Sequence, residues 1–285
     1  MNRIQGTTQL TGLLGYPLKH SKSPHMHNSA YDCLGLDYVY LAFELPEGTI
    51  EQGLQSMKTL NAAGWNVTMP HKEKVLAHLD TVSQEARLIG SCNTVKNDAG
   101  HLTGYNTDGQ GFIRSLHEKS IAVKGEKVVM AGAGGAGKAV AVCLALEGVR
   151  ELVIFNRELD RPRELAERIM NEMPDCKVRA ELLDEAHISR ELQDAVLFVN
   201  TTSMGMKGQE DLSAIENPAS LPKHVYVYDV VYAPAETKLM KIAAQAGCKT
   251  QNGLDMMLWQ GAIAFKIFTG EDMPIDYVRQ ELAKL

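Results

Sequence analysis

Several polar side chains of this chain lie where predicted strands end, and one of them is a lysine in an unusual position. Lys72 follows Thr68, the last residue of a short apolar run, and lies at the start of the next predicted helix. A cation at a helix N-terminus is unfavourable, because that end of the helix dipole is positive. A solvated surface lysine is the commoner explanation, but the misplacement indicates acid–base use. His71 is a rival for that role, although nothing near it would orient it.

Asp108 and Asn93 are two further polar residues beside predicted elements. Asp108 lies at the start of a helix predicted over 107–118, where a carboxylate can cap free backbone N–H groups. Asn93 lies in a strand predicted over 92–96, and an asparagine amide can also bond its own backbone in a loop. These structural explanations suffice for each residue alone, so a chemical role for either one stays open.

Two serines, Ser21 and Ser23, lie between the first predicted strand and the first predicted helix. Pro24 follows them, and proline is common at a helix start, so one serine is explained as the residue that caps the helix. Capping explains one serine well and the pair poorly. Taken alone, the structural interpretation is favoured, with ligand binding by both hydroxyls as the alternative.

A glycine turn connects a strand predicted over 126–131 to a helix predicted over 136–146. Its glycines, Gly132, Gly134 and Gly137, fit the pattern G-x-G-x-x-G. This pattern needs one glycine for a tight turn, one for the approach of a pyrophosphate and one for close helix–strand packing. The helix N-terminus adds free N–H groups and the positive end of its dipole. Because a second strand follows in the required order, the segment predicts a dinucleotide site.

The turn after that second strand, which is predicted over 151–155, bears on which dinucleotide binds. Arg157 and Arg161 would favour the 2′-phosphate of NADP, whereas an acidic side chain favours the free ribose hydroxyl of NAD. Glu158 and Asp160 stand in the same turn, so two positive and two negative side chains nearly cancel. The turn predicts that NAD is accepted well, with NADP still usable. Whether NAD is preferred stays open.

The elements that must position these residues alternate between short apolar runs and amphipathic runs, which is typical of an α/β fold. Besides those already given, strands are predicted at 10–15, 38–43, 65–68, 101–105, 177–181, 196–200 and 225–229. Further helices are predicted at 25–34, 49–60, 72–79, 163–172, 189–195, 253–269 and 275–285. The sequence Asn97-Asp98-Ala99-Gly100 predicts a hairpin between two of the strands.

Composition excludes several classes of function. The net charge of −6 and the pI near 5.9 give no support for nucleic acid or a membrane surface as partner. No apolar run approaches the roughly 18 residues that span a bilayer, and the N-terminus lacks the apolar core of a signal peptide. The five scattered cysteines predict reduced thiols and a cytoplasmic location. No His, Cys or carboxylate cluster has metal-ligand spacing, so we expect no metal.

A series of motifs, taken in order, resembles the shikimate dehydrogenase family, including its quinate/shikimate dehydrogenase branch. The motifs are S-K-S-P at 21–24, N-V-T-M-P-x-K at 66–72, N-T at 93–94, N-T-D-G-x-G at 106–111, G-A-G-G-A-G at 132–137, N-R at 156–157, T-S-M-G-M at 202–206, D-V-V-Y-A-P at 229–234 and G-L-D-M-M-L-W-Q-G at 253–261. Their joint agreement over nearly the whole chain is more specific than any single motif. One departure is Ser203, where the family usually has proline, which puts the conformation of this cofactor-side loop in doubt.

The resemblance implies a role for each matched residue. Ser21 and Ser23 would hold the substrate carboxylate, and Lys72 and Asp108 would form the catalytic pair. The residues that would contact ring hydroxyls or close the pocket are Thr68, Lys72, Asn93, Asp108, Tyr232 and Gln260. The implied cofactor contacts are Gly132, Ala133, Gly134, Gly135, Ala136, Asn156, Arg157, Glu158, Asp160, Arg161, Thr202, Met206, Val230 and Gly253.

The resemblance also implies a two-domain α/β architecture. An N-terminal substrate-binding domain over 1–106 would be completed by 246–285, whose helices pack back on it. A Rossmann NAD(P)-binding domain would cover 107–245, with the site in the cleft between the two domains. The expected partner is a small-molecule substrate, with neither nucleic acid nor membrane. A homodimer is one option, because the sequence leaves the oligomeric state open.

The implied activity is the reversible NAD(P)-dependent reduction of 3-dehydroshikimate to shikimate, a step of aromatic amino acid biosynthesis. Reducing a ring ketone needs a hydride at carbon and a proton at the emerging alkoxide. A lysine oriented by an aspartate can supply that proton. Two alternatives are a quinate or dual quinate/shikimate dehydrogenase, and a non-catalytic dinucleotide-binding protein. The intact Lys72 and Asp108 argue against the second alternative.

Overall fold

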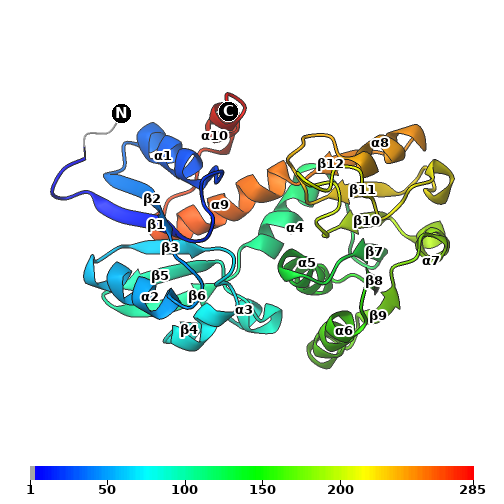
Figure 1. Cartoon of the computed structure of the whole chain (residues 1–285), viewed down its shortest axis with the longest axis horizontal. Helices are drawn as coiled ribbons and strands as arrows, with labels where there is room; N and C mark the ends of the chain where they lie inside the picture. Colours follow the sequence, from blue (N-terminus) through cyan, green and yellow to red (C-terminus); the bar gives the residue numbers. More distant parts are fainter. Residues whose placement is uncertain (1–3) are drawn as a thin grey trace. The chain divides into compact units, whose positions relative to one another are not determined.

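The computed structural model describes residues 4–285 and divides into two compact units. The first unit comprises Met1–Gly111 with Leu258–Leu285, and the second comprises Phe112–Met257. Each unit is built on one six-stranded sheet (Figure 1). The predicted fold class, α/β with two structural units, is therefore confirmed.

The sheet of the first unit has the strand order β2-β1-β3-β5-β6-β4. β1 pairs in parallel with β2 and β3, whereas β5 is antiparallel to both β3 and β6. The predicted hairpin connects β5 and β6, where Ala99 and Gly100 take the positive φ values of 51° and 95° that such tight turns require. The strands are β1 (Gln9–Gly15), β2 (Tyr38–Glu44), β3 (Gly64–Val67), β4 (Thr81–Val82), β5 (Thr94–Asp98) and β6 (His101–Tyr105).

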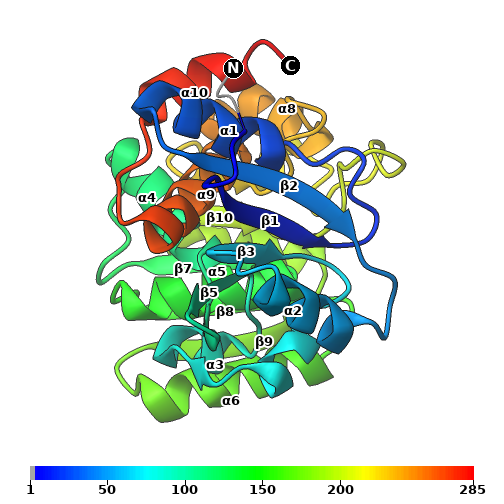
Figure 2. The same cartoon turned by 90° about the vertical axis from the view of Figure 1, so that its left-hand side faces the viewer.

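Helices cover both faces of this sheet (Figure 2). One face carries α1 (Ser23–Leu34), α10 (Ile275–Leu282) and the part of α9 (Leu254–Thr269) that belongs to the first unit. On this face His27 of α1 stacks on Tyr40 of β2, with ring centroids 4.3 Å apart, and Phe268 of α9 lies 5.9 Å from His27. On the other face Leu54 of α2 (Ile50–Thr59) packs in one cluster with the buried Trp65 of β3.

The helix predicted over 72–79 is wrong in type and in its start. The structure has a five-residue 3-10 helix, η1 (Lys74–His78), and Lys72 lies in the turn before it. α3 (Gln84–Ile89) and β4 in the first unit, and α8 (Lys238–Gln245) and β12 (Thr250–Asn252) in the second, are absent from the predicted elements. Elements of two to eight residues show too few hydrophobic repeats for a period to be recognised.

The sheet of the second unit is entirely parallel, with the strand order β12-β11-β10-β7-β8-β9. β7 and β8 carry continuous apolar runs, as expected for strands that are buried on both faces. α5 and α6 lie on one face, together with α4 (Asp108–Glu118), and α7 and α8 lie on the other (Figure 1). The elements not yet given are β7 (Lys127–Ala131), α5 (Gly135–Leu146), β8 (Glu151–Asn156), α6 (Asp160–Glu172), β9 (Lys177–Leu182), α7 (Glu185–Glu191), β10 (Leu197–Asn200) and β11 (Tyr226–Asp229).

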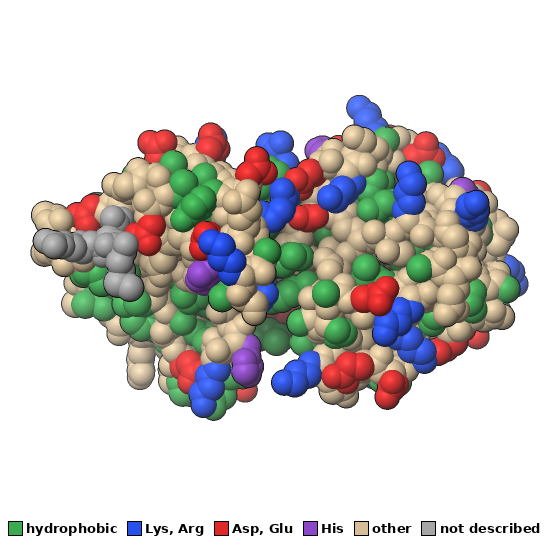
Figure 3. Space-filling view, turned by 90° about the horizontal axis from the view of Figure 1, so that it is seen from above, with side chains coloured by type: hydrophobic (Ala, Val, Ile, Leu, Met, Phe, Trp, Pro, Cys, Tyr) green, Lys and Arg blue, Asp and Glu red, His purple; other side chains and the backbone are tan. Residues whose placement is uncertain are grey.

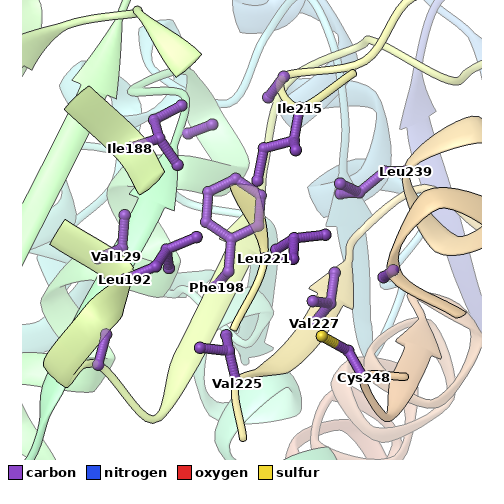
Figure 4. Packing of buried hydrophobic residues seen from close by; sticks show 14 of the residues in the cluster. Val129, Ile188, Leu192, Phe198, Ile215, Leu221, Val225, Val227, Leu239 and Cys248 are labelled. Atoms are coloured by element: carbon purple, nitrogen blue, oxygen red, sulfur yellow. The ribbon is translucent and has the colours of Figure 1, made fainter. Parts of the chain in front are cut away.

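A hydrophobic cluster fixes α7 and α8 on their face of the parallel sheet (Figure 4). Phe198 of β10 and Val227 of β11 are fully buried in it. Ile188 of α7 and Leu239 of α8 complete the cluster from the helix side. The strands therefore alternate side chains between two helix layers, and the polar residues that follow the strands are left at the sheet edge.

The order of the strands reverses between β7 and β10. The chain runs outward from β7 through β8 to β9, then returns to place β10 on the other side of β7. In open parallel sheets ligands bind beyond the carboxyl ends of strands at such a reversal. The predicted glycine turn follows β7 and therefore lies at this point of the sheet.

The surface carries both signs of charge. Acidic and basic side chains are interspersed over the face seen in Figure 3. Within residues 4–285, no helix is both long enough and apolar enough to cross a membrane.

Candidate active site

Lys72 and Asp108 lie side by side in the first unit. The Nζ atom of Lys72 is 2.6 Å from Oδ2 of Asp108. Lys72 belongs to the turn after β3, and Asp108 is the first residue of α4. The side chains are 25% and 13% exposed, so the ion pair is partly shielded from solvent and still open to a ligand.

The turn that carries Lys72 is held at several points. The backbone N–H of Cys92 donates to the carbonyl oxygen of Lys72 at 2.8 Å, and that of His71 donates to Thr68 at 3.0 Å. The His71 side chain is fully buried, and its Nε2 lies 2.9 Å from the carbonyl oxygen of Leu45. His71 therefore anchors the turn in the protein interior, whereas the Lys72 side chain is 25% exposed.

Asn93 contacts both the aspartate and its neighbours. Its Nδ2 donates to Oδ1 of Asp108 at 2.9 Å and to Oγ1 of Thr107 at 3.0 Å. Its Oδ1 accepts from the backbone N–H of Thr107 at 2.8 Å. Both carboxylate oxygens of Asp108 are thus bonded, one by Lys72 and one by Asn93, so the carboxylate has a single orientation.

Neither serine is the N-cap residue of α1. That residue is Lys22, whose side chain makes no capping hydrogen bond. Ser21 Oγ accepts from the backbone N–H of Ser23, the first residue of the helix, at 3.3 Å. Both serines are half-buried. The predicted N-cap position is therefore wrong for both serines, although Ser21 bonds the first N–H group of the helix, and ligand binding remains as the alternative.

Thr68 follows β3, beside the end of β1. A Cβ atom at Gly15 would lie 2.3 Å from Cγ2 of Thr68 and 2.9 Å from the Met69 carbonyl oxygen. Only glycine at position 15 allows this approach. The glycine brings the Thr68 turn against the end of β1 and leaves Thr68 half-buried.

Gln260 and Tyr232 belong to different units. The Oε1 atom of Gln260, on α9, lies 3.5 Å from Nδ2 of Asn93, so Gln260 adjoins the lysine–aspartate pair. Tyr232 follows β11 in the second unit, where burial raises the pKa of its hydroxyl. The structure thus brings together four of the predicted substrate residues, namely Lys72, Asn93, Asp108 and Gln260.

In the second unit the glycine turn has the shape that its pattern predicts. Gly132 has a φ of 104°, a conformation that favours glycine. A Cβ atom at Gly137 would lie 2.6 Å from the carbonyl oxygen of Gly132, so Gly137 permits the helix to pack closely. Gly134 and Gly135 face open space at the start of α5, where a ligand phosphate could approach the backbone.

A pocket of about 540 Å³ opens beside this turn. It is lined by Gly132, Ala133, Gly134, Phe155, Asn156, Arg157, Glu158, Arg161, Leu183, Thr201, Thr202, Ser203, Met204, Gln209 and Leu212. Of the predicted cofactor residues, the lining does not include Gly135, Ala136, Asp160, Met206, Val230 and Gly253. Seven lining residues were not among the predicted cofactor contacts: Phe155, Leu183, Thr201, Ser203, Met204, Gln209 and Leu212. Of these, Leu183, Gln209 and Leu212 lie outside every motif that the sequence singled out. Only the position of Leu183, directly after a strand, gave a signal.

A buried carboxylate organises the loops after β10 and β11. Asp229 accepts from Nδ2 of Asn200 at 2.9 Å, from Oγ1 of Thr237 at 2.7 Å and from the backbone N–H of Val231 at 3.1 Å. Burial raises the pKa of Asp229, although these three bonds favour the ionised form. Asn200 also accepts from the Thr202 hydroxyl at 2.6 Å. The network fixes the conformation of Thr202 and Val231 without a proline at 203.

Val230, which follows β11, and Gly253, which follows β12, pack tightly against each other. A Cβ atom at Gly253 would lie 1.9 Å from the carbonyl oxygen of Val230, so only glycine fits there. Met206, another predicted cofactor residue, is 48% exposed in the loop after β10.

Across the described part of the chain, no group of three or more His, Cys, Asp or Glu side chains could hold a metal ion.

Together these features define a class. A glycine turn at the strand-order reversal of a parallel sheet, with a pocket beside it, is typical of Rossmann-type dinucleotide-binding proteins. The other α/β unit holds a partly exposed lysine–aspartate pair, a candidate for the acid–base group that an oxidoreductase needs.

Comparison with known proteins identifies the family. Three family models match: "Shikimate dehydrogenase substrate binding domain" over 13–95, "Shikimate / quinate 5-dehydrogenase" over 115–230 and "Shikimate 5'-dehydrogenase C-terminal domain" over 253–283. The chain is 50% identical over 278 residues to shikimate dehydrogenase (NADP(+)) of Alkaliphilus metalliredigens, covering 98% of this chain and 97% of the relative. The chain belongs to the shikimate dehydrogenase family.

Solved structures agree with this assignment. The crystal structure of shikimate 5-dehydrogenase from Listeria monocytogenes, in complex with shikimate and NAD, superposes with a TM-score of 0.95 at 43% identity, covering 99% of each chain. Quinate dehydrogenase from Corynebacterium glutamicum, in complex with NAD, gives a TM-score of 0.88 at 34% identity, covering 98% of this chain and 99% of that one.

Proposed function

We propose that this protein reversibly reduces 3-dehydroshikimate to shikimate. The observation that carries the proposal is the Lys72–Asp108 pair with Asn93 bonded to the same carboxylate. In the reducing direction, the ketone carbon gains a hydride and Lys72 Nζ gives a proton to the oxygen. Asp108 holds the ammonium group in place and stabilises its charge. In the reverse direction, Lys72 takes the proton from the hydroxyl.

The first unit supplies most of the proposed substrate contacts, which supports a substrate-binding role for 1–106 with 246–285. We assign the carboxylate to Ser21 and Ser23, because neither residue is the N-cap of α1 and both side chains are partly exposed. The remaining proposed contacts are Thr68, Asn93, Tyr232 and Gln260, which offer hydroxyl and amide groups to the ring hydroxyls.

The second unit, which contains most of 107–245, is the proposed dinucleotide-binding part. Its residues fit such a cofactor, because Gly134 and Gly135 face open space at the start of α5 and two arginines line the adjoining pocket. A nicotinamide cofactor, when bound, supplies or accepts the hydride. We propose that NAD and NADP are both usable. The proposed contacts outside the pocket are Gly135, Ala136, Asp160, Met206, Val230 and Gly253.

A rate assay tests the function directly. Purified protein is given shikimate or quinate with NAD or NADP, four combinations in all, and formation of the reduced cofactor is followed. We expect turnover with shikimate in the presence of at least one cofactor. If neither NAD nor NADP supports turnover of shikimate, the proposal is contradicted.

Quinate is the second candidate substrate, because a quinate dehydrogenase is among the similar structures. If kcat/KM for quinate equals or exceeds that for shikimate, quinate replaces shikimate as the proposed substrate. We also propose a homodimer and a cytoplasmic location. The five cysteines are free thiols, which supports the location. Sedimentation and cell fractionation test these two proposals.

A further inference from the structure

A chain of buried hydrogen bonds leads from Tyr40 to Asp108. The Tyr40 hydroxyl donates to Oδ1 of Asn66 at 2.7 Å. Nδ2 of Asn66 donates to the carbonyl oxygen of Asn93 at 3.1 Å and to Oγ1 of Thr94 at 3.0 Å. Because the Asn93 side chain donates to Asp108, the chain of bonds ends on the carboxylate that holds the lysine.

The direction of each bond follows from the groups involved. A carbonyl oxygen only accepts, so Asn66 must turn Nδ2 toward Asn93 and Oδ1 toward Tyr40. The tyrosine hydroxyl must therefore donate. In the same way, the backbone N–H of Thr107 only donates, which turns Oδ1 of Asn93 toward it and Nδ2 toward Asp108. Neither amide can flip without losing bonds, so the network has one arrangement.

Tyr40 is itself held by two residues of α1. The Asn28 side chain bonds both the backbone N–H and the carbonyl oxygen of Tyr40 at 2.9 Å. The His27 ring stacks on the tyrosine ring, and burial lowers the pKa of His27 to about 3, so the stacked imidazole is neutral. The origin of the network is therefore rigid.

We propose that Tyr40 and Asn66 are positioning residues, which hold Asn93 and thereby the Asp108 carboxylate in the orientation that aligns Lys72 for proton transfer. The inference rests on the proposed function, since it takes Lys72 as the acid. Tyr40 is 0% exposed and Asn66 is 7% exposed, so both act through Asn93. Small misplacements of a reacting group cost large factors in rate, which gives such a network its effect.

The first test is Tyr40→Phe, which keeps the stacked ring and removes one hydroxyl. We expect kcat with shikimate to fall about tenfold. The KM for shikimate is expected to change less than about threefold, because the proposed carboxylate contacts remain. The matched control is Tyr31→Phe. Tyr31 is buried in the same aromatic cluster, and its hydroxyl lies 2.9 Å from Oγ1 of Thr11, outside the network.

The comparison separates positioning from folding. Both tyrosine variants lose one buried hydrogen bond, so both are expected to lower Tm. Only Tyr40→Phe is expected to lower kcat, and Tyr31→Phe is expected to keep kcat within about twofold of wild type. Equal kcat values for the two variants, measured per folded molecule, would overturn the inference.

Asn66→Ala provides an independent variant, and it carries the test if Tyr40→Phe does not fold. It is expected to lower kcat at least as much as Tyr40→Phe, again with a small change in KM. In the double variant, the loss is expected to be smaller than the product of the single losses, because both act through Asn93. An Asn66→Ala enzyme with wild-type kcat, or strictly multiplicative losses, would refute the network.

These outcomes differ from a failure of the proposed function. If wild-type protein does not oxidise shikimate, or if Lys72→Ala keeps normal turnover, the proposed function fails. If wild type is active and Lys72→Ala is not, while Tyr40→Phe matches Tyr31→Phe, only the positioning role is lost.

Discussion

Lys72 is the residue on which the proposed chemistry depends most directly. Its 2.6 Å contact with Asp108 and its partial exposure place a charged amine where a ligand can reach it. Lys72→Ala is therefore expected to lower kcat by about 10²–10⁴-fold, with a smaller change in substrate affinity. Steady-state kinetics with shikimate measure both constants.

Lys74→Ala is the matched control for that variant. Lys74 lies two residues further on and pairs with Glu47 at 2.7 Å, but both side chains are more than half exposed. Exposed ion pairs contribute little, so activity and Tm are expected to stay near wild type. Near-normal kcat in Lys72→Ala would remove this lysine from the mechanism.

Ser21 and Ser23 provide the second residue-scale prediction. Replacing both with alanine is expected to raise the KM for shikimate and to leave the KM of the cofactor unchanged. Each hydrogen bond to a charged group contributes roughly 1.5–3 kcal/mol. Because neither serine is the N-cap residue of α1, and Ser21 bonds a helix N–H group only at 3.3 Å, loss of helix stability is not the expected cause. An unchanged KM, or a fall in Tm that accounts for all lost activity, would speak against carboxylate binding.

At the scale of elements, an ion network holds the amino ends of the parallel strands to α7. Lys127 at the start of β7 pairs with Glu191 at 2.9 Å, and Arg179 of β9 also bonds Glu191. The Arg179 guanidinium, followed by Lys127, lowers the pKa of Glu191 to about 2. These side chains lie at the opposite strand ends from the glycine turn, so their role is stability.

The sign of the pH effect follows from that shift. The folded pKa of Glu191 lies below its ordinary value of 4.5, so its stabilisation is present above pH 4.5. It is lost as pH falls from 4.5 toward about 2. We expect Glu191→Gln to lower stability at neutral pH and to flatten the decline over this range. Urea unfolding at several pH values measures the free energy of unfolding. Glu164→Gln is the control, because Glu164 pairs with Arg168 on the surface. If the free energies of wild type and Glu191→Gln fall in parallel with pH, the Glu191 carboxylate does not cause the decline.

The elements also show where sequence reasoning succeeds and where it stops. β7, the glycine turn and α5 were predictable because a buried parallel strand, a G-x-G-x-x-G pattern and a helical period are all local signals. β4 was not predictable, because its two residues form a strand only by pairing with β6, and η1 is too short to show a hydrophobic period. The same applies to the site. The residue types at 72, 93 and 108 were visible in the sequence. The bonds from Tyr40 through Asn66 arise only when β1 pairs with both β2 and β3, and β3 pairs with β5.

At the scale of the whole molecule, the two units divide the proposed work. The residues proposed to bind substrate lie mostly in the first unit, and the pocket beside the glycine turn belongs entirely to the second. The family and fold were predicted from motifs spread over both units. The boundaries between the units lie after Gly111 and Met257, whereas the sequence predicted domain boundaries at 106 and 245. The difference arises because α4 and α9 each continue from one unit into the other. Changes to cofactor binding are therefore expected to leave shikimate binding unaltered.

Cofactor preference tests that division. Arg157, Glu158 and Arg161 line the same pocket, and Asn156 Nδ2 holds the turn by donating to the Glu158 carbonyl oxygen at 2.8 Å. The Glu158 carboxylate repels a 2′-phosphate and favours the free ribose hydroxyl of NAD. Glu158→Thr keeps the backbone bond and removes that charge. It is expected to raise kcat/KM for NADP more than it lowers kcat/KM for NAD, with the KM for shikimate unchanged. Arg163→Ala, a change on the exposed side of α6, is the control, since this side chain is outside the pocket lining. A wild-type preference for NADP above about 100-fold, or ~2.7 kcal/mol, would overturn the expectation that NAD is well accepted.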